Sequence, residues 1–321
     1  MKLRVGFVAM SVNLKNATPS STMTVTNFNK IIDREAGLRK LTNIAAKNLQ
    51  NTLRILRHAH AHDIHLYRFT SKLIPMLGHE LTEGWNFWSK LGPEFEEVGK
   101  FVRDTGMRVS FHPDHYTILN SKSDEVVANS ILDMERHVKM FELMGLDERA
   151  KLVMHVGGSF KDKADSLQRF EENWASVPDH VKRRVTLEND DKTYTALETL
   201  ELCERLGIPM VLDIHHHRCN PGDEELRDLV PRVFATWEPT GLVPKIHVSS
   251  PKSEEDPRHH ADYIDIQDLV PFLDLVHEID NQDFDIMVEA KQKDDSAFRL
   301  AADLAQVEGM KKIDGGTFEY K

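Results

Sequence analysis

Eight short apolar runs, separated by amphipathic segments, constrain the fold of this 321-residue chain more than any other feature. The runs are rich in Val, Ile, Leu, Met and Phe, which is typical of strands buried on both faces of a parallel sheet. They occupy residues 3–10, 65–70, 108–113, 151–157, 184–189, 209–215, 244–250 and 284–290.

The segments between these runs show helical periodicity. Residues 41–62 and 125–144 repeat apolar side chains at helical spacing, and a last helix is expected near 297–305. Segment 196–206 ends at Gly207, a typical helix C-cap. The alternation predicts α/β architecture: a single (β/α)8 TIM barrel over residues 1–321, with its active site at the C-terminal ends of the strands. Residues 310–321 are expected to form a tail or a lid at the barrel's edge.

A doubly wound open sheet is the alternative fold. It would normally carry a glycine-rich phosphate loop after its first strand, whereas here Ser11-Val12-Asn13-Leu14 follows. The N-terminal run is predicted to be a strand and not a secretion signal. No stretch approaches the ~20 apolar residues of a membrane helix. The two cysteines, Cys203 and Cys219, predict no disulfide framework, so a cytoplasmic location is expected.

Residue types that bind metal recur where the predicted strands end. They are His112, His155, Glu188, Asp213, His216, His247 and Glu289, with His79 and His260 in the loops after strands two and seven. In a (β/α)8 barrel these positions converge on one rim. A lone His or Glu at a strand end is usually just solvated. Six successive strands ending in His, Asp or Glu predict a shared metal site.

The mixture of imidazole and carboxylate without thiolate suits Mn²⁺, Zn²⁺ or Fe²⁺. The ligands suffice for two or three ions, and Glu188, on the central strand of the set, is the natural bridging carboxylate. Such a cluster suits in-line displacement at phosphorus. A barrel with fewer metals would suit sugar isomerisation, and the ligand set alone does not separate these two reactions.

The motifs taken together resemble those of the UV damage endonucleases. The similarity covers residues from about 3 to 295 and rests on NLQNTLRILRHAHAHDIHLYRFTSKLIPMLGHE, RVSFHPDHY, KLVMHVGG, RVTLEND, VLDIHHH, PKIHVSS and IMVEAKQKD, in that order. The resemblance implies a barrel related to the type IV abasic-site endonucleases. It also implies incision of double-stranded DNA immediately 5′ of cyclobutane pyrimidine dimers and 6-4 photoproducts, which begins excision repair.

The resemblance further implies a cofactor and partners. The cofactor would be a cluster of two to three divalent ions, with Mn²⁺ favoured and Zn²⁺, Co²⁺ or Mg²⁺ as alternatives. The partner would be UV-damaged duplex DNA. We expect no membrane and no obligate protein partner, and we expect a monomer because a groove of duplex size leaves no need for a partner subunit. The formal net charge of −11 argues weakly against nucleic acid, unless bound cations and a local basic groove reverse the sign at the site.

Individual residues follow from the same resemblance. The metal ligands would be His112, His155, Glu188, Asp213, His216, His247, His260 and Glu289. Glu188, Lys245 and His79 would be catalytic. Lys245 falls on a lysine that the family associates with carboxylation, and a direct phosphate contact is the alternative role.

Four further residues are candidates for DNA and lesion binding. His115 and Tyr116 occupy the position of a probe pair that wedges into the duplex, although the family pattern is Gln followed by Tyr. Phe7 and Ser11 are weaker candidates, with roles in the core and in capping a loop as alternatives. A sugar isomerase or epimerase, an abasic-site endonuclease and a DNA-damage sensor without nuclease activity remain the alternative functions.

Overall fold

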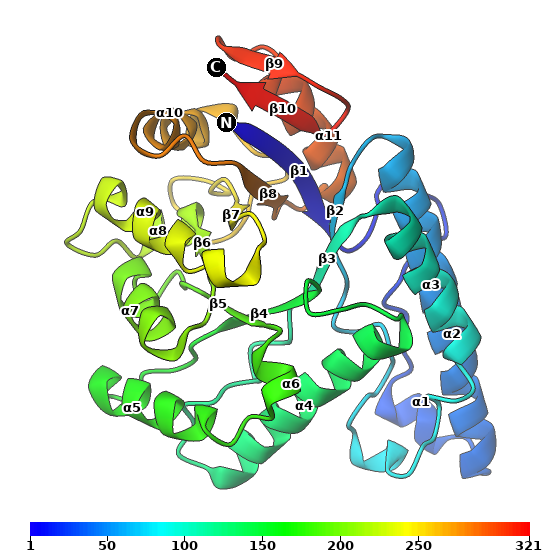
Figure 1. Ribbon diagram of the computed structural model, residues 1–321. Helices are drawn as coiled ribbons and strands as arrows, with labels where there is room; N and C mark the ends of the chain where they lie inside the picture. The colour runs from blue at the N-terminus through cyan, green and yellow to red at the C-terminus, as the bar shows by residue number, and fades with distance from the viewer.

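All eight predicted runs form parallel strands of one closed barrel in the computed structural model, which describes residues 1–321 (Figure 1). The strands are β1 (Lys2–Val8), β2 (Leu66–Arg68), β3 (Arg108–Phe111), β4 (Lys151–His155), β5 (Val185–Glu188), β6 (Met210–Asp213), β7 (Lys245–Val248) and β8 (Phe284–Val288). Each pairs with the next, and β1 pairs with both β8 and β2, which closes the barrel. The predicted (β/α)8 fold is therefore confirmed.

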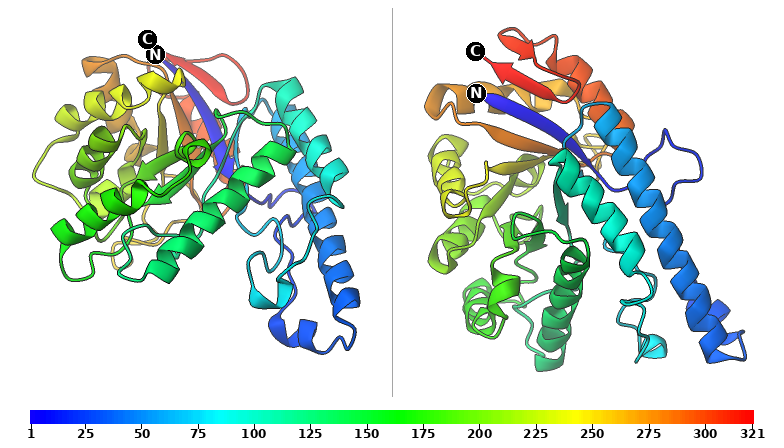
Figure 2. Two further views of the ribbon diagram at one scale, coloured as in Figure 1. Left: turned by 60° about the horizontal axis from the view of Figure 1, so that its bottom comes forward. Right: turned by 45° about the vertical axis from the view of Figure 1, so that its right-hand side comes forward.

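Helices surround the barrel on its outside (Figure 1). They are α1 (Val25–Asn29), α2 (Arg34–Ala61), α3 (Gly92–Thr105), α4 (Asp124–Leu143), α5 (Lys163–Trp174), α6 (Asp179–Lys182), α7 (Ala196–Leu206), α8 (Ile214–Cys219), α9 (Leu226–Ala235), α10 (Val270–Ile279) and α11 (Lys293–Leu304), with 3-10 turns η1 (Glu80–Thr82), η2 (Glu238–Thr240) and η3 (Ile266–Asp268). The long α2 begins earlier than predicted because the Asp33 side chain caps it, and Figure 2 shows α2 beside α3. Gly207 ends α7 at a φ of 66°, as expected for a C-cap.

The last residues form a β-hairpin where a tail or lid was expected. Strands β9 (Met310–Lys312) and β10 (Thr317–Tyr320) pair antiparallel, and β10 pairs with residues 2–4 of β1. Because β2 pairs only with residues 6–8 of β1, the first half of β1 would otherwise present a free edge. The hairpin covers that edge at the N-terminal end of the barrel, and Phe318 is fully buried there.

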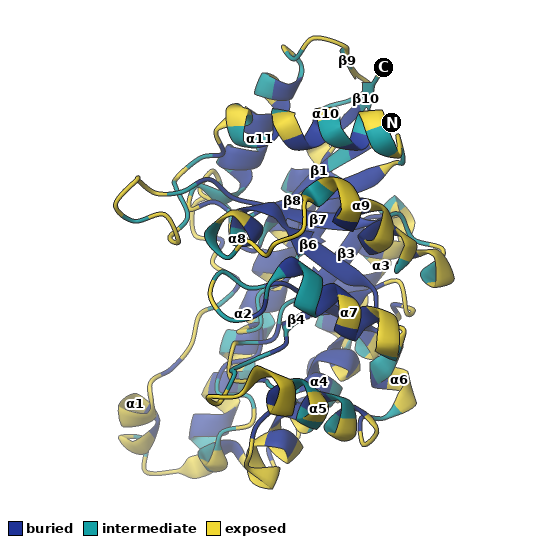
Figure 3. Ribbon diagram, turned by 90° about the vertical axis from the view of Figure 1, so that its left-hand side faces the viewer, coloured by how far each residue is buried: buried dark blue, intermediate teal, exposed yellow.

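Burial follows the two-layer design, with buried strands inside and helices that expose one face (Figure 3). At the N-terminal end of the barrel, Trp237 packs with Val153 and Val211. The indole Nε1 of Trp237 donates a hydrogen bond of 2.6 Å to the Met210 carbonyl oxygen. The opposite end of the barrel carries polar side chains, and these form the candidate site. None of the helices combines the length and the apolar character that crossing a membrane requires.

Candidate metal centre

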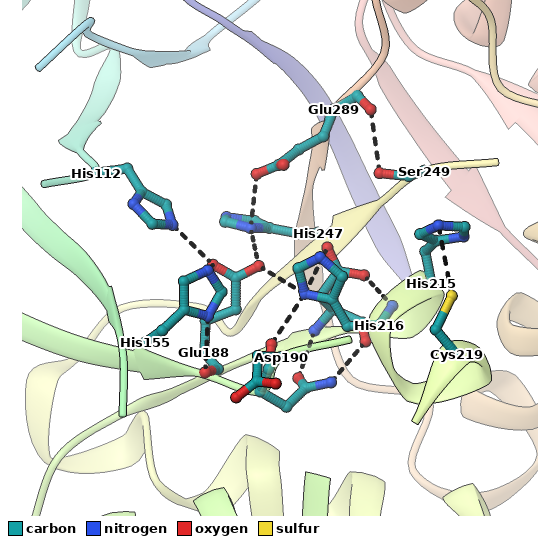
Figure 4. Close-up of polar contacts among 12 residues, drawn as sticks. His112, His155, Glu188, Asp190, His215, His216, Cys219, His247, Ser249 and Glu289 are labelled. Atoms are coloured by element: carbon teal, nitrogen blue, oxygen red, sulfur yellow. Dashed lines mark hydrogen bonds and ion pairs between the residues drawn. The ribbon is translucent and has the colours of Figure 1, made fainter. Parts of the chain in front are cut away.

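Glu188, the last residue of β5, lies at the centre of four imidazoles (Figure 4). Its Oε2 atom is 3.1 Å from Nε2 of His112 and 3.9 Å from Nε2 of His155. Its Oε1 atom is 3.0 Å from Nδ1 of His247 and 3.5 Å from Nδ1 of His216. Four histidines therefore surround this carboxylate: one follows β3, and the others lie in β4, β7 and α8.

Asp213 ends β6 two residues earlier than predicted, because it also caps α8. Its Oδ1 atom accepts a hydrogen bond of 2.8 Å from the His216 backbone N–H. This cap places His216 one turn along, with Nδ1 3.7 Å from Oδ2 of Asp213. Aspartate and histidine three residues apart thus face the same side through ordinary N-capping.

Glu289 follows β8 and completes the other side of the cluster. Its Oε1 atom lies 3.0 Å from Nδ1 of His247, so His247 contacts Glu188 and Glu289 together. The same oxygen of Glu289 forms an ion pair with the guanidinium of Arg68 at the end of β2. Arg68 offsets part of the negative charge that the two carboxylates concentrate in a buried space.

Mutual charge favours the ionised forms of Glu188, Glu289, His216 and His247, whereas burial raises the pKa of Asp213 and lowers that of His155. Burial by itself would raise the pKa of Glu188, but the surrounding imidazoles, His247 first, hold that pKa well below its usual range. Burial would likewise lower the pKa of His247 and His216. Glu188 and Glu289 outweigh this effect for His247, and Asp213 with Glu188 does so for His216, so that each pKa rises to about 9. Without metal, protons supply the positive charge that these carboxylates require.

The donor set fits divalent cations. Three groups of three ligand atoms lie within 4.8 Å of one another: His112–His155–Glu188, Glu188–Asp213–His216 and Glu188–His247–Glu289. All three contain Glu188, the residue predicted to bridge. Two buried atoms, Oδ2 of Asp213 and Nε2 of His247, have no hydrogen-bond partner. Buried polar atoms without partners are costly, and a bound cation would satisfy the aspartate oxygen.

His260 and His79 lie outside these ligand groups. The His260 ring centre is 6.3 Å from that of His216, so this histidine borders the cluster without joining it. His79 caps η1, where its Nδ1 accepts a hydrogen bond of 3.1 Å from the Leu81 N–H. It lines a separate pocket with Trp85 and Arg136. The structure therefore brings His260 beside the candidate centre and leaves His79 apart from it.

Lys245 lies beneath the cluster, two residues before His247 on the same face of β7. Its ammonium group is fully buried, and Nζ donates a hydrogen bond of 3.3 Å to Oγ of Ser110. Burial, followed by the nearby Arg108, holds the pKa of Lys245 well below its ordinary value. This burial leaves Lys245 no direct path to a DNA phosphate in this structure.

The candidate DNA-contact residues fall into two pairs. His115 and Tyr116 are exposed in the loop after β3, with ring centres 5.9 Å apart, and the Tyr116 hydroxyl donates to Asp114 at 3.1 Å. Phe7 instead is fully buried and packs edge-on against Tyr67. Ser11 hydrogen-bonds through Oγ to Asp294 and accepts from the Leu14 N–H. Phe7 and Ser11 therefore occupy the alternative positions of core residue and loop cap.

Asn189 is a residue of the site that the sequence reasoning missed. It is fully buried next to Glu188, and its side chain exchanges hydrogen bonds of 2.9 and 3.0 Å with the backbone of Asp213. Its carbonyl oxygen lies 2.9 Å from Nδ1 of His216. Asn189 thereby fixes the ends of β5 and β6 relative to each other. An amide directly after a predicted ligand at a strand end was the signal for this role.

Comparisons with known proteins show which family this chain is similar to. A sequence model of the family described as UV-endonuclease UvdE matches residues 3–321. A relative from Bacillus pumilus, named UV DNA damage endonuclease, is 44% identical over 322 residues, which cover 100% of both chains. The crystal structure of SacUVDE is 31% identical, with a TM-score of 0.82, and the match covers 95% of this chain and 98% of that chain.

A more distant similarity concerns the fold alone. The structure of the 3-keto-D-glucoside 4-epimerase YcjR from E. coli matches with a TM-score of 0.54 at 12% identity, over 94% of this chain and 98% of that chain. At this identity the match shows a shared barrel and leaves the chemistry to the site itself.

Proposed function

This chain belongs to the UV-endonuclease UvdE family, and on that premise we propose that it is a metal-dependent DNA-repair endonuclease. Its reaction is hydrolysis of the phosphodiester immediately 5′ of UV photoproducts, both cyclobutane pyrimidine dimers and 6-4 products. One observation carries the proposal: Glu188 is common to three groups of potential metal ligands on the rim where barrel enzymes keep their active sites. The proposed enzyme works in the cytoplasm as a monomer on duplex DNA.

In this proposal the cluster residues hold two to three divalent ions, with Mn²⁺ preferred. Glu188 would be the carboxylate that the ions share, and His112, His155, Asp213, His216, His247 and Glu289 would complete the ligand groups. His260, which borders the cluster, is the remaining proposed ligand. Such ions, when bound, supply Lewis-acid stabilisation of phosphate charge and make water more acidic. Phosphate-ester hydrolysis is among the slowest uncatalysed reactions, and a lone general base, worth about 10²–10⁴-fold, would not suffice.

The remaining proposed roles belong to the chain's own side chains. Arg68 and Asn189 hold Glu289, Asp213 and His216 in place through the contacts described above. Lys245 acts from beneath the cluster as a buried amine of low basicity. For His79 we propose a positioning role through the loop after β2, since it lies away from the ligand groups.

We assign recognition of the damaged duplex to His115 and Tyr116. The Tyr116 side chain is exposed although aromatic, with 62% of its surface accessible, and it lies on the loop that starts at the ligand His112. Exposed rings can stack into a gap in the duplex, and photoproducts are already poorly stacked. A planar imidazole at His115 can serve in place of the amide that the family pattern carries.

The test is incision of an end-labelled duplex with one site-specific thymine dimer, with Mn²⁺ and with chelator. We expect cleavage immediately 5′ of the dimer that chelator abolishes, and no cleavage of the undamaged duplex. An abasic duplex serves as the comparison that separates the two endonuclease classes. Absence of cleavage of every duplex with Mn²⁺, Zn²⁺, Co²⁺ and Mg²⁺ would refute the nuclease proposal.

A further inference from the structure

A cavity of about 320 Å³ adjoins the candidate metal centre on the side of β1, β2 and β3. It shares His112 and His155 with that centre, and its other walls come from the loops after these strands and from the start of α11. Arg68, His115 and Lys293 line it as well. The cavity therefore connects the ligand cluster with the proposed wedge. Two cationic side chains line it, together with one carboxylate, Asp114, which accepts hydrogen bonds from Ser71 and Tyr116.

Two residues that line this cavity have a backbone conformation unusual for side chains larger than glycine. Met10 has a φ of 89° and Lys293 a φ of 48°. Such strain persists only where surrounding contacts impose it, and it concentrates at functional sites. Next to Lys293, the fully buried Asp294 accepts hydrogen bonds from Ser11 Oγ and, at 2.9 Å, from the Val12 N–H. Asp294 thus ties the loop after β1 to the start of α11.

The ammonium group of Lys293 is the cation of this cavity that forms no ion pair. It is half-buried, and no hydrogen bond or ion pair engages it. Arg68, by contrast, is already paired with Glu289. Burial, and then the nearby Arg68, lower the pKa of Lys293, and the carboxylate of Glu289 offsets part of this effect. A half-buried cation without a partner, beside a second cation, favours a bound anion over water alone.

We propose that Lys293 binds a non-bridging oxygen of the DNA phosphate that lies beside the metal centre, with the attached nucleotide in the adjoining cavity. The inference rests on the proposed endonuclease function and adds a substrate-binding residue to it. Negative charge on a phosphodiester increases as a nucleophile attacks phosphorus. A fixed ammonium group at that oxygen therefore stabilises the transition state more than the bound substrate.

The experiment compares Lys293→Met, Lys293→Arg, Lys291→Met and Lys312→Met with the parent protein. Lys291 is exposed near the rim, and Lys312 is exposed at the opposite end of the barrel, so each variant removes one positive charge elsewhere. The assays are single-turnover cleavage of the dimer duplex with Mn²⁺ and the salt dependence of duplex binding by fluorescence anisotropy. Metal content and melting temperature are measured for every variant.

We expect Lys293→Met to slow cleavage by about 10- to 100-fold, the effect of losing one hydrogen bond to a charged group. The slope of log K against log salt should fall by about 0.9, because one phosphate contact is lost. Lys293→Arg should recover part of the rate, Lys291→Met should have a smaller effect than Lys293→Met, and Lys312→Met should match the parent.

A parent-like rate and slope in Lys293→Met, or an equal loss in Lys291→Met, would overturn the assignment. A lowered metal content in Lys293→Met would also overturn it, by showing that the residue serves the metal centre. If the parent protein binds DNA but cleaves no duplex, the endonuclease proposal fails, while the salt slope still decides whether Lys293 contacts phosphate.

Discussion

Replacing Glu188 with Gln tests the candidate centre most directly. The substitution keeps the size of a side chain that is almost fully buried, with 1% exposed, and removes only its charge and one acceptor oxygen. Because Glu188 belongs to all three ligand groups, the substitution replaces one carboxylate ligand of each group with a neutral amide. Two of the histidines, His216 and His247, also lose a nearby anion that raises their pKa to about 9.

The expected size of the effect follows from these contacts. Loss of an outer partner of a metal ligand typically lowers metal affinity by about 10–100-fold, so loss of a shared direct ligand should exceed about 100-fold. Metal ions contribute several kcal/mol to transition-state stabilisation. If about 4 kcal/mol is lost with them, cleavage slows by about 10³-fold.

The assay combines metal content by elemental analysis with single-turnover cleavage of the dimer duplex. The matched control is Glu238→Gln, the same chemical change at an exposed position near the opposite end of the barrel, and it should behave like the parent. Circular dichroism establishes that both variants fold. A folded Glu188→Gln protein with parental metal content and more than a tenth of the parental rate would refute the bridging role.

Three further outcomes follow from the structure. Metal binding requires neutral imidazoles. His216 and His247 have pKa values of about 9, so both are protonated at pH 7 in the metal-free protein. Apparent Mn²⁺ affinity should therefore rise from pH 7 to about 9 and then level off. Calorimetry across this range checks the trend, and an affinity independent of pH would contradict it. Trp237→Ala should lower the free energy of unfolding by about 3–5 kcal/mol, because the indole fills the N-terminal end of the barrel; an unchanged urea midpoint would argue otherwise. Phe318→Ala should cost about 3 kcal/mol by loosening the hairpin from β1, and faster hydrogen exchange at residues 2–4 would distinguish this local effect from global unfolding.

Much of the fold was predictable because it depends on local periodicity. Each barrel strand is an apolar run bounded by helical segments, so the eight strands and their parallel order could be inferred without coordinates. The C-terminal hairpin could not, because β10 pairs with residues at the other end of the chain. Its pairing depends on an edge of β1 that exists only once β2 has paired with the second half of that strand.

The sequence by itself determined which side chains meet at the rim, since parallel strands in a barrel bring their C-terminal ends together. Glu188, His112 and His247 follow from that rule. Only the tertiary structure decided the distances between them. These distances distinguish side chains that contact one another from side chains that merely lie on the same rim. His79 caps a turn in its own pocket, Phe7 is buried beside Tyr67, and Lys293 points into a cavity without a partner. The positions of these side chains depend on loop conformation and on contacts between segments distant in the sequence. A local sequence pattern therefore does not predict them.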